Sequence, residues 1–317
     1  MSIKNRKSFI CGIKGYKLTN KEYIFIKKYK PWGIILFERN IKNIKQVAKL
    51  TNSIKKIFKD SYYPILIDEE GGRVSRLKNI IDNSIFSGQF FGDLIKKNKK
   101  NFNLYYQVYI DQISYLLNII GVNINTVPVL DIRRNFTHNI IGDRSYSTDK
   151  SIVDFIGTTT INLFSKNRIG TVIKHIPGHG LSKKDSHIKL PRINNKLRYL
   201  EKNDFKLFKN KSSFFAMTAH IVYDVLDPNY CVTHSKKAID YIRNKIGFKN
   251  LIISDDISMK ALRYSFNDNI IRAYNSGCNL VLHCNGNMNE MLSLGKIAPK
   301  VDAFTFKKTS EFYKLLS

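Results

Sequence analysis

Cysteine is scarce in this chain of 317 residues, and long apolar runs are absent from it. The four cysteines (Cys11, Cys231, Cys278 and Cys284) include no CxxC pair, which argues against a disulfide framework and against a zinc site built on cysteines. The first residues hold only a short apolar patch, and charged residues or asparagines interrupt every later apolar run. We therefore expect a cytoplasmic protein with reduced thiols and no membrane partner.

Acidic residues are also few: 25 Asp and Glu stand against 53 Lys and Arg, which gives a net charge of +28. A charge of this size is typical of proteins that bind nucleic acids or other anionic surfaces. However, lysine and asparagine recur along the whole chain, as in 97–101, 194–196 and 209–211, and no arginine-rich arm, finger spacing or single basic helix concentrates the charge. This pattern favours a general residue bias, and no nucleic-acid partner is expected.

The chain has no linker rich in Pro, Gly or Ser and no internal repeat beyond an alternation of strands and helices. The phosphate-loop pattern GxxxxGK[ST] is absent as well. We expect a single domain over residues 1–317 and a monomer, although no feature of the sequence determines the oligomeric state.

Short apolar runs rich in β-branched residues recur between longer helical patterns. There are eight of them, at 9–13, 33–37, 65–67, 122–129, 171–173, 214–217, 251–253 and 280–282. This alternation predicts a (β/α)₈ TIM-type barrel of parallel, buried strands. The segment 78–117 is long for one connection and predicts an extra helix, and 298–317 predicts a last helix that closes the barrel.

Polar residues follow most of these runs at their C-terminal ends. They are Asp68, Asp131, Lys174 with His175, His220, Asp255 and His283. In a TIM-type barrel the C-terminal ends of the strands meet at one face, where active sites lie. We therefore expect these side chains to converge on one site.

The segment 68–76 (DEEGGRVSR) follows the third run. An ionised Asp68 offers two acceptor oxygens, which suits two neighbouring sugar hydroxyls. The glycines at 71 and 72 allow a turn and a close approach of the backbone to a ligand. Taken alone, the segment is equally compatible with a charged surface turn.

Three histidines lie within thirteen residues, His175, His179 and His187. The first two have the i, i+4 spacing of a helical zinc pair, but Pro177 and two glycines disfavour a helix there. The other interpretation is a loop that brings Asp185 and His187 to a substrate, with the carboxylate fixing the imidazole tautomer and the free nitrogen exchanging a proton. The same Asp-Ser-His sequence is also compatible with an exposed loop that has no catalytic function.

Two neighbouring carboxylates, Asp255 and Asp256, leave the seventh run. Because adjacent strand residues point to opposite faces, only one of them is expected to face the barrel mouth, and the other can cap the following helix. The spacing does not decide between them. Arg144 lies in the segment 142–146 after the fourth run, which is also compatible with a plain surface loop.

Six blocks of sequence together resemble glycoside hydrolase family 3, and most closely its bacterial β-N-acetylhexosaminidases of peptidoglycan recycling. The blocks are IDEEGGRVSRL, VPVLDIRR, GDRSYS, KHIPGHG with DSH, MTAHIVYD and ISDDISMKAL, and they occur in the family's order between about residues 33 and 285. Each block is weak alone, whereas six in order are specific.

The resemblance implies a role for each matching residue. Asp255 matches the nucleophile, His187 the acid/base residue and Asp185 its orienting partner. Five further positions match those that bind the terminal sugar: Asp68, Arg76, Arg144, Lys174 and His175. The family's reaction retains configuration and needs neither a metal nor an organic cofactor, so neither is expected here.

The departures from the family pattern are Glu69, where Gln is common, Ile176 in place of Phe, Thr218 in place of Pro, and Asn279 in place of an acidic residue. Of these, Glu69 is expected to add a negative charge near the sugar site.

The resemblance implies a retaining hydrolase that releases terminal N-acetylglucosamine (GlcNAc) from muropeptides, that is, from GlcNAc–1,6-anhydro-N-acetylmuramic acid with or without peptide. A phosphorylase of the same family is an alternative, because a neutral imidazole repels phosphate less than a carboxylate does. The net charge motivates a third hypothesis from a different class, a non-catalytic barrel that binds anionic polymers.

Overall fold

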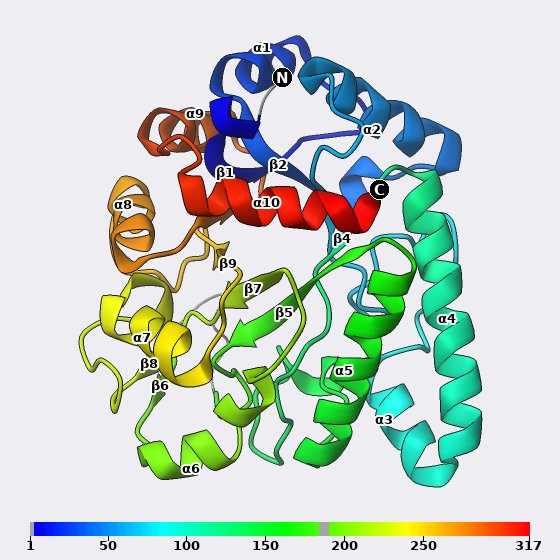
Figure 1. Ribbon diagram of the computed structural model, residues 1–317, viewed down its shortest axis with the longest axis vertical. Coiled ribbons are helices and arrows are strands. Elements are labelled where there is room, and N and C mark those ends of the chain that lie inside the picture. The colour runs from blue at the N-terminus through cyan, green and yellow to red at the C-terminus, as the bar shows by residue number, and fades with distance from the viewer. Residues whose placement is uncertain (1–2, 184–189) are drawn as a thin grey trace.

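The computed structural model describes residues 3–183 and 190–317. Eight parallel strands close into a barrel in the order β1-β10-β9-β7-β5-β4-β3-β2 (Figure 1). Their bounds are β1 Lys7–Gly12, β2 Pro31–Leu36, β3 Ile65–Ile67, β4 Ile124–Asn125, β5 Gly170–Ile176, β7 Phe215–Thr218, β9 Leu251–Asp256 and β10 Leu280–His283. The predicted (β/α)₈ barrel is confirmed, and each of the eight apolar runs contributes one strand.

Helices surround the strands. They are α1 Asn20–Tyr29, α2 Ile44–Phe58, α3 Gly88–Lys97, α4 Lys99–Ile119, α5 Lys150–Lys166, α6 Leu197–Lys202, α7 Lys236–Tyr241, α8 Phe266–Ser276, α9 Met288–Ile297 and α10 Ala303–Leu316. Two short strands, β6 Arg192–Ile193 and β8 Val222–Tyr223, pair with each other outside the barrel. The extra helix predicted between the third and fourth strands is confirmed and is in fact a pair, α3 and α4.

Strand β4 is much shorter than the run 122–129 that predicts it. Val127 turns back to donate to the carbonyl of Asn125, and Pro128 has no N–H to contribute to a ladder. The run is still buried throughout, so its apolar character reflects its place in the core rather than regular pairing.

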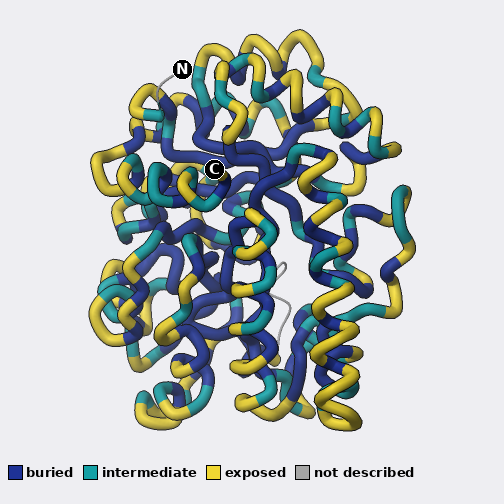
Figure 2. The backbone as a smooth tube through the Cα atoms, turned by 45° about the vertical axis from the view of Figure 1, so that its right-hand side comes forward, coloured by how far each residue is buried: buried dark blue, intermediate teal, exposed yellow. Residues whose placement is uncertain are grey.

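The last helix, α10, covers the end of the barrel at which the strands begin (Figure 1). Phe312 packs edge-on against Phe215 with the ring centres 5.2 Å apart, and Trp32 Nε1 donates to Thr309 Oγ1 over 2.8 Å. In Figure 2 the buried, dark blue part of the tube runs through the middle of the molecule, and exposed segments lie around its outside. The prediction of a closing helix is confirmed, and the opposite face, where the strands end, is left for a site.

Candidate active site

A pocket of about 180 Å³ lies at the C-terminal ends of the strands. Its described lining comes from six strands or the segments that follow them: Asp68, Glu70, Arg73, Val74, Arg76, Ile140, Ile141, Arg144, Lys174, His175, His179, Met217, Asp255, Leu282 and Cys284. The predicted residues Asp68, Arg76, Arg144, Lys174, His175 and Asp255 are all in this set. Residues far apart in the sequence therefore converge here, as parallel strands of a barrel require.

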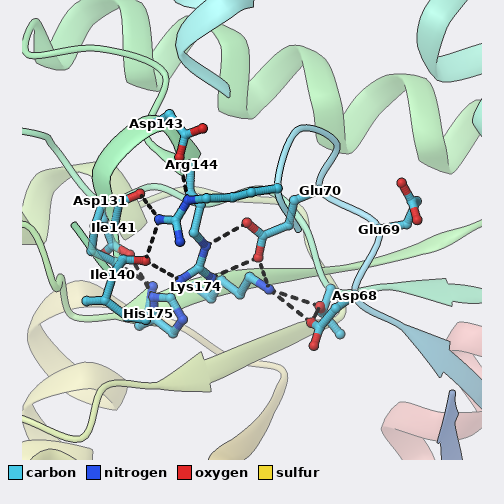
Figure 3. A network of polar contacts seen from close by, with 12 residues as sticks. Asp68, Glu69, Glu70, Asp131, Ile140, Ile141, Asp143, Arg144, Lys174 and His175 are labelled. Atoms are coloured by element: carbon cyan, nitrogen blue, oxygen red, sulfur yellow. Dashed lines mark hydrogen bonds and ion pairs between the residues drawn. The ribbon is translucent and has the colours of Figure 1, made fainter. Parts of the chain in front are cut away.

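One ionic network forms much of the pocket wall (Figure 3). Lys174 Nζ lies 3.1 Å from Asp68 Oδ1 and 2.6 Å from Glu70 Oε1. Arg144 donates a bidentate pair of hydrogen bonds to Glu70, from Nε to Oε2 over 2.7 Å and from Nη2 to Oε1 over 2.8 Å. Arg76 Nη2 adds a longer contact of 3.6 Å to Asp68. The donors and acceptors that a sugar hydroxyl needs are thus held in place before any ligand binds.

The charges in this network are fixed by its geometry. Burial alone would raise the pKa of Asp68, but Lys174, Arg76 and the hydrogen bonds from Thr126 and Lys174 outweigh it and hold that pKa well below its usual range. For Glu70 the same opposition, burial against Arg144 and Lys174, lowers the pKa to about 2. Both carboxylates are therefore ionised at neutral pH and act as hydrogen-bond acceptors.

Glu69 does not add charge to the sugar site, contrary to the expectation from sequence. Its carboxylate is turned away from the network (Figure 3) and accepts hydrogen bonds from the backbone of Arg76 and Leu77 at 2.7 and 3.0 Å, from Asn83 Nδ2 at 2.5 Å and from Ser75 Oγ at 3.2 Å. It organises the turn that carries Arg76 rather than contacting a ligand. Glu70, one residue later, faces the pocket instead, although the sequence motif predicts no role for it.

Asp131 supports the two described histidines from behind. It is buried and accepts from His175 Nδ1 at 2.7 Å and from the backbone N–H of His179 at 2.6 Å. Burial, with His175 nearby, lowers the pKa of His179 to about 4, so its ring is neutral at pH 7. Asp131 thus orients the side of the pocket formed by 174–179 without lining it.

The neighbouring carboxylates Asp255 and Asp256 have different surroundings. Asp255 lines the pocket, and one of its oxygens accepts from the backbone of Asp256 over 2.7 Å. Asp256 accepts from the backbone N–H groups of Ser258 and Cys284, both at 3.1 Å, and from Ser258 Oγ at 2.9 Å. Asp256 ties the end of β9 to β10 and to the following turn, which leaves Asp255 as the member of the pair that faces the pocket.

Besides Asp131, which supports the pocket from behind, two of the polar residues expected there do not line it, and for them the expectation was wrong. His220 is fully buried, with Nδ1 2.7 Å from Thr233 Oγ1 and Nε2 3.1 Å from the carbonyl oxygen of Asp256. His283 is buried too, and its Nε2 lies 2.8 Å from Glu290 on α9. Each imidazole has its hydrogen-bond partner within the protein. A polar residue near the end of a strand can therefore have a structural role and need not belong to the site.

The predicted acid/base pair, His187 and Asp185, lies outside the described residues, which resume at 190. Within residues 3–183 and 190–317, no three His, Cys, Asp or Glu side chains are grouped so as to hold a metal ion. In the same part of the chain, no helix combines the length and the apolar character needed to cross a membrane.

Comparison with known proteins decides the family. The model of the glycosyl hydrolase family 3 N-terminal domain matches residues 9–307, nearly the whole chain. The chain belongs to glycoside hydrolase family 3. The resemblance found in the six sequence blocks is confirmed, and with it the prediction of a glycoside hydrolase.

Similar proteins include a β-hexosaminidase of Nitrosomonas eutropha, 30% identical over 87% of this chain and 80% of that protein. β-Hexosaminidase A of Pseudoalteromonas piscicida is 27% identical over 81% of this chain, but the match spans only 46% of that longer protein. Among solved structures, NagZ from Neisseria gonorrhoeae in complex with N-trifluoroacetyl-D-glucosamine superposes with a TM-score of 0.83 at 25% identity, covering 98% of this chain and 91% of that one.

Proposed function

We propose that this family 3 enzyme is a retaining exo-β-N-acetylglucosaminidase that releases terminal GlcNAc from muropeptides, including GlcNAc–1,6-anhydro-N-acetylmuramic acid, in the cytoplasm. The observation that carries the proposal is the position of Asp255, a carboxylate facing a small pocket whose wall is a preformed set of sugar hydrogen-bonding groups. The relatives named β-hexosaminidase and the NagZ complex with an N-acylated glucosamine support the choice of sugar.

The size and charge of the pocket support removal of one sugar from a chain end. At about 180 Å³ it is smaller than the roughly 300–1,000 Å³ of sites for larger ligands, so it suits a single pyranose. Among its described residues, Asp68, Glu70 and Asp255 balance Arg76, Arg144 and Lys174, while Arg73 pairs with Asp143 at 2.6 Å. The net charge of the chain is therefore not concentrated in the pocket, which speaks against a site for a polyanion or for phosphate.

In the proposed reaction, a carboxylate oxygen of Asp255 attacks the anomeric carbon while the bond from that carbon to the leaving oxygen breaks. His187, oriented by Asp185 as the resemblance implies, gives its proton to that oxygen. The histidine then takes a proton from water, the water oxygen attacks the anomeric carbon, and the bond to Asp255 breaks. Asp68, Glu70, Lys174 and Arg144 hold the ring through its hydroxyls in both steps, and two inversions give net retention.

The test is hydrolysis of an aryl β-GlcNAc glycoside by wild type, Asp255→Asn and His187→Ala, with Asp256→Asn as the matched control. We expect Asp255→Asn to lose turnover by several orders of magnitude, whereas Asp256→Asn keeps the nucleophile and loses mainly stability. Near-normal turnover in folded Asp255→Asn would overturn the nucleophile assignment.

Two further measurements test the reaction type and the substrate. NMR of the first product formed should show the β-anomer of GlcNAc, and the α-anomer would exclude retention. Added phosphate should leave the products unchanged, since GlcNAc-1-phosphate as the main product would identify a phosphorylase. Faster cleavage of GlcNAc–1,6-anhydro-N-acetylmuramic acid than of GlcNAc-β-1,4-GlcNAc is expected for a muropeptide enzyme, and the reverse order would refute that substrate.

A further inference from the structure

Helix α4 is the longest helix among the described residues, and it lies at the edge of the molecule (Figure 1). One side of it packs against α3 and α5 through Phe102, Tyr106, Ile110, Ile113 and Leu117. The other side is also apolar, because Leu104, Tyr105, Val108, Tyr115 and Ile119 are between 39 and 66% exposed. An apolar side of a helix is normally covered, yet only one of the two apolar sides of α4 is covered by other described elements, while a third, polar side carries Asn103 and Gln107.

The exposed side follows the spacing of a helix–helix seam. Tyr105, Val108, Gln112, Tyr115 and Ile119 are separated by three, four, three and four residues, the heptad pattern by which one helix packs along another. Charge is correspondingly rare. In a protein with a quarter of its residues charged, the 21 residues of α4 include only Lys99, Lys100 and Asp111. Asp111 is already engaged, since it accepts from Asn167 Nδ2 at 2.7 Å.

From this face we infer that α4 pairs with the α4 helix of a second copy of this chain, in antiparallel orientation, to form a twofold dimer. The spacing of the exposed seam residues is nearly symmetric about Gln112. In an antiparallel pair, Tyr105 therefore meets Ile119 of the second copy and Val108 meets its Tyr115, while the two Gln112 amides face each other at the axis. A twofold interface needs this self-complementarity, because each patch must fit its own copy.

The charges select the antiparallel orientation. In this register Lys99 and Lys100 lie five to six residues past Ile119 of the other copy, so they are positive charges on the side toward which the negative C-terminal end of that helix points. A parallel pair would instead place four lysines together in a protein that already carries +28. Aromatic enrichment with depletion of charge is also the composition of interface cores.

The available area permits a specific but modest dimer. Burying an aromatic side chain removes about 150–250 Å² from water, so the exposed fractions amount to roughly 500 Å² for each copy. The pair would then bury about 1,000 Å², which is near the lower limit for a specific interface. We therefore expect a dimer whose population depends on protein concentration in the accessible range.

Sedimentation equilibrium over a concentration series tests the inference. Wild type should pass from the mass of one chain to twice that mass, whereas Val108→Glu and Tyr115→Glu should stay monomeric, because each places two like charges in the seam. Asn103→Glu is the matched control, as it adds the same charge to α4 at an exposed position off the seam and should still dimerise. All variants should hydrolyse the aryl glycoside like wild type, which verifies that they fold.

Cross-linking tests the register independently. Gln112→Cys should form a disulfide-linked dimer on mild oxidation, while Gln107→Cys, exposed on the same helix but away from the seam, should not. The inference is overturned if wild type stays monomeric at every concentration, or if the two cysteine variants cross-link equally. It is also overturned if Tyr115→Glu abolishes binding to anionic lipid vesicles but leaves the mass unchanged, since the occupant would then be a membrane surface.

Discussion

Substituting Glu70 by Gln should destabilise the protein at neutral pH and remove part of its sensitivity to acid. The side chain is 5% exposed and its carboxylate contacts both Arg144 and Lys174, so the variant keeps the shape but leaves two buried cations short of a counter-ion. Removing one partner of a buried ion pair costs about 3–5 kcal/mol.

The pKa of Glu70 gives a second estimate of the stability lost in Glu70→Gln. The network lowers the pKa of Glu70 from 4.5 to about 2, which corresponds to roughly 3 kcal/mol of folding free energy. Because the pKa is lower in the folded state, this stability is present above the ordinary pKa and is lost as pH falls from about 4.5 through about 2. The difference between wild type and Glu70→Gln should therefore be about 3 kcal/mol at pH 7 and should shrink toward zero near pH 2.

Thermal and urea unfolding of both proteins between pH 7 and pH 3 would measure this difference. For a chain of this length, 3 kcal/mol corresponds to a melting temperature lower by about 5 °C. Glu38→Gln is the control, since its ion pair with Lys78 is half exposed and 3.4 Å long, and it should change stability by no more than about 1 kcal/mol. A difference between wild type and Glu70→Gln that does not depend on pH would refute the reasoning.

Three further substitutions probe other parts of the same framework. Glu69→Gln should stabilise the protein at pH 7, because burial raises the pKa of Glu69 in the folded state. The folding free energy linked to this group is most favourable below its ordinary pKa and is lost as pH rises through the folded pKa. Urea unfolding at pH 4 and pH 7 measures this effect, and a variant less stable than wild type at pH 7 would contradict it. Asp131→Asn should lower kcat/KM on the aryl glycoside about 10–100-fold, because His175 loses a charged acceptor whose hydrogen bond contributes about 1.5–3 kcal/mol. Unchanged kinetics would show that this contact does not position the His175 imidazole. Arg6→Met should lower the free energy of unfolding by about 3–5 kcal/mol, because it removes the buried partner of Asp60. Activity should be unchanged at temperatures where the variant is folded. A loss of kcat in the folded variant would show that Arg6 contributes to catalysis as well as to stability.

The strands could be predicted from sequence because their signal is local. A buried parallel strand is a short apolar run, and eight such runs are visible without any knowledge of their neighbours. The length of β4 could not be predicted in this way, because residues 122–129 are buried throughout whereas regular pairing also depends on the missing N–H of Pro128. Burial and regular pairing are different properties, and the sequence pattern reports mainly the first.

The site was predictable only in part, for a related reason. Asp68 follows β3 directly, and Lys174 and Asp255 lie near the C-terminal ends of β5 and β9, so their convergence follows from the barrel. For Glu70 the sequence offers one local indication: in extended backbone, residues two apart point to the same face, so Glu70 is expected on the same side as Asp68. Its role, however, depends on Arg144, which lies 74 residues away. The partners of His220 likewise lie at a distance along the chain, at Thr233 and the backbone of Asp256. His283 pairs with Glu290 on the next helix, a contact that only the folded structure shows.

Buried arginines join distant segments at both ends of the barrel, but with different consequences. At the end covered by α10, Arg6 donates to Tyr313 at 2.9 Å and contacts Asp60, and every partner belongs to the protein. An apolar core can replace such a cluster, because nothing else needs its charges. At the pocket end, the charges of Glu70 and Arg144 also line a cavity, so replacing them removes donors and acceptors that a sugar would use. Arg6→Met and Glu70→Gln should therefore cost similar stability, yet only Glu70→Gln should raise KM for the glycoside.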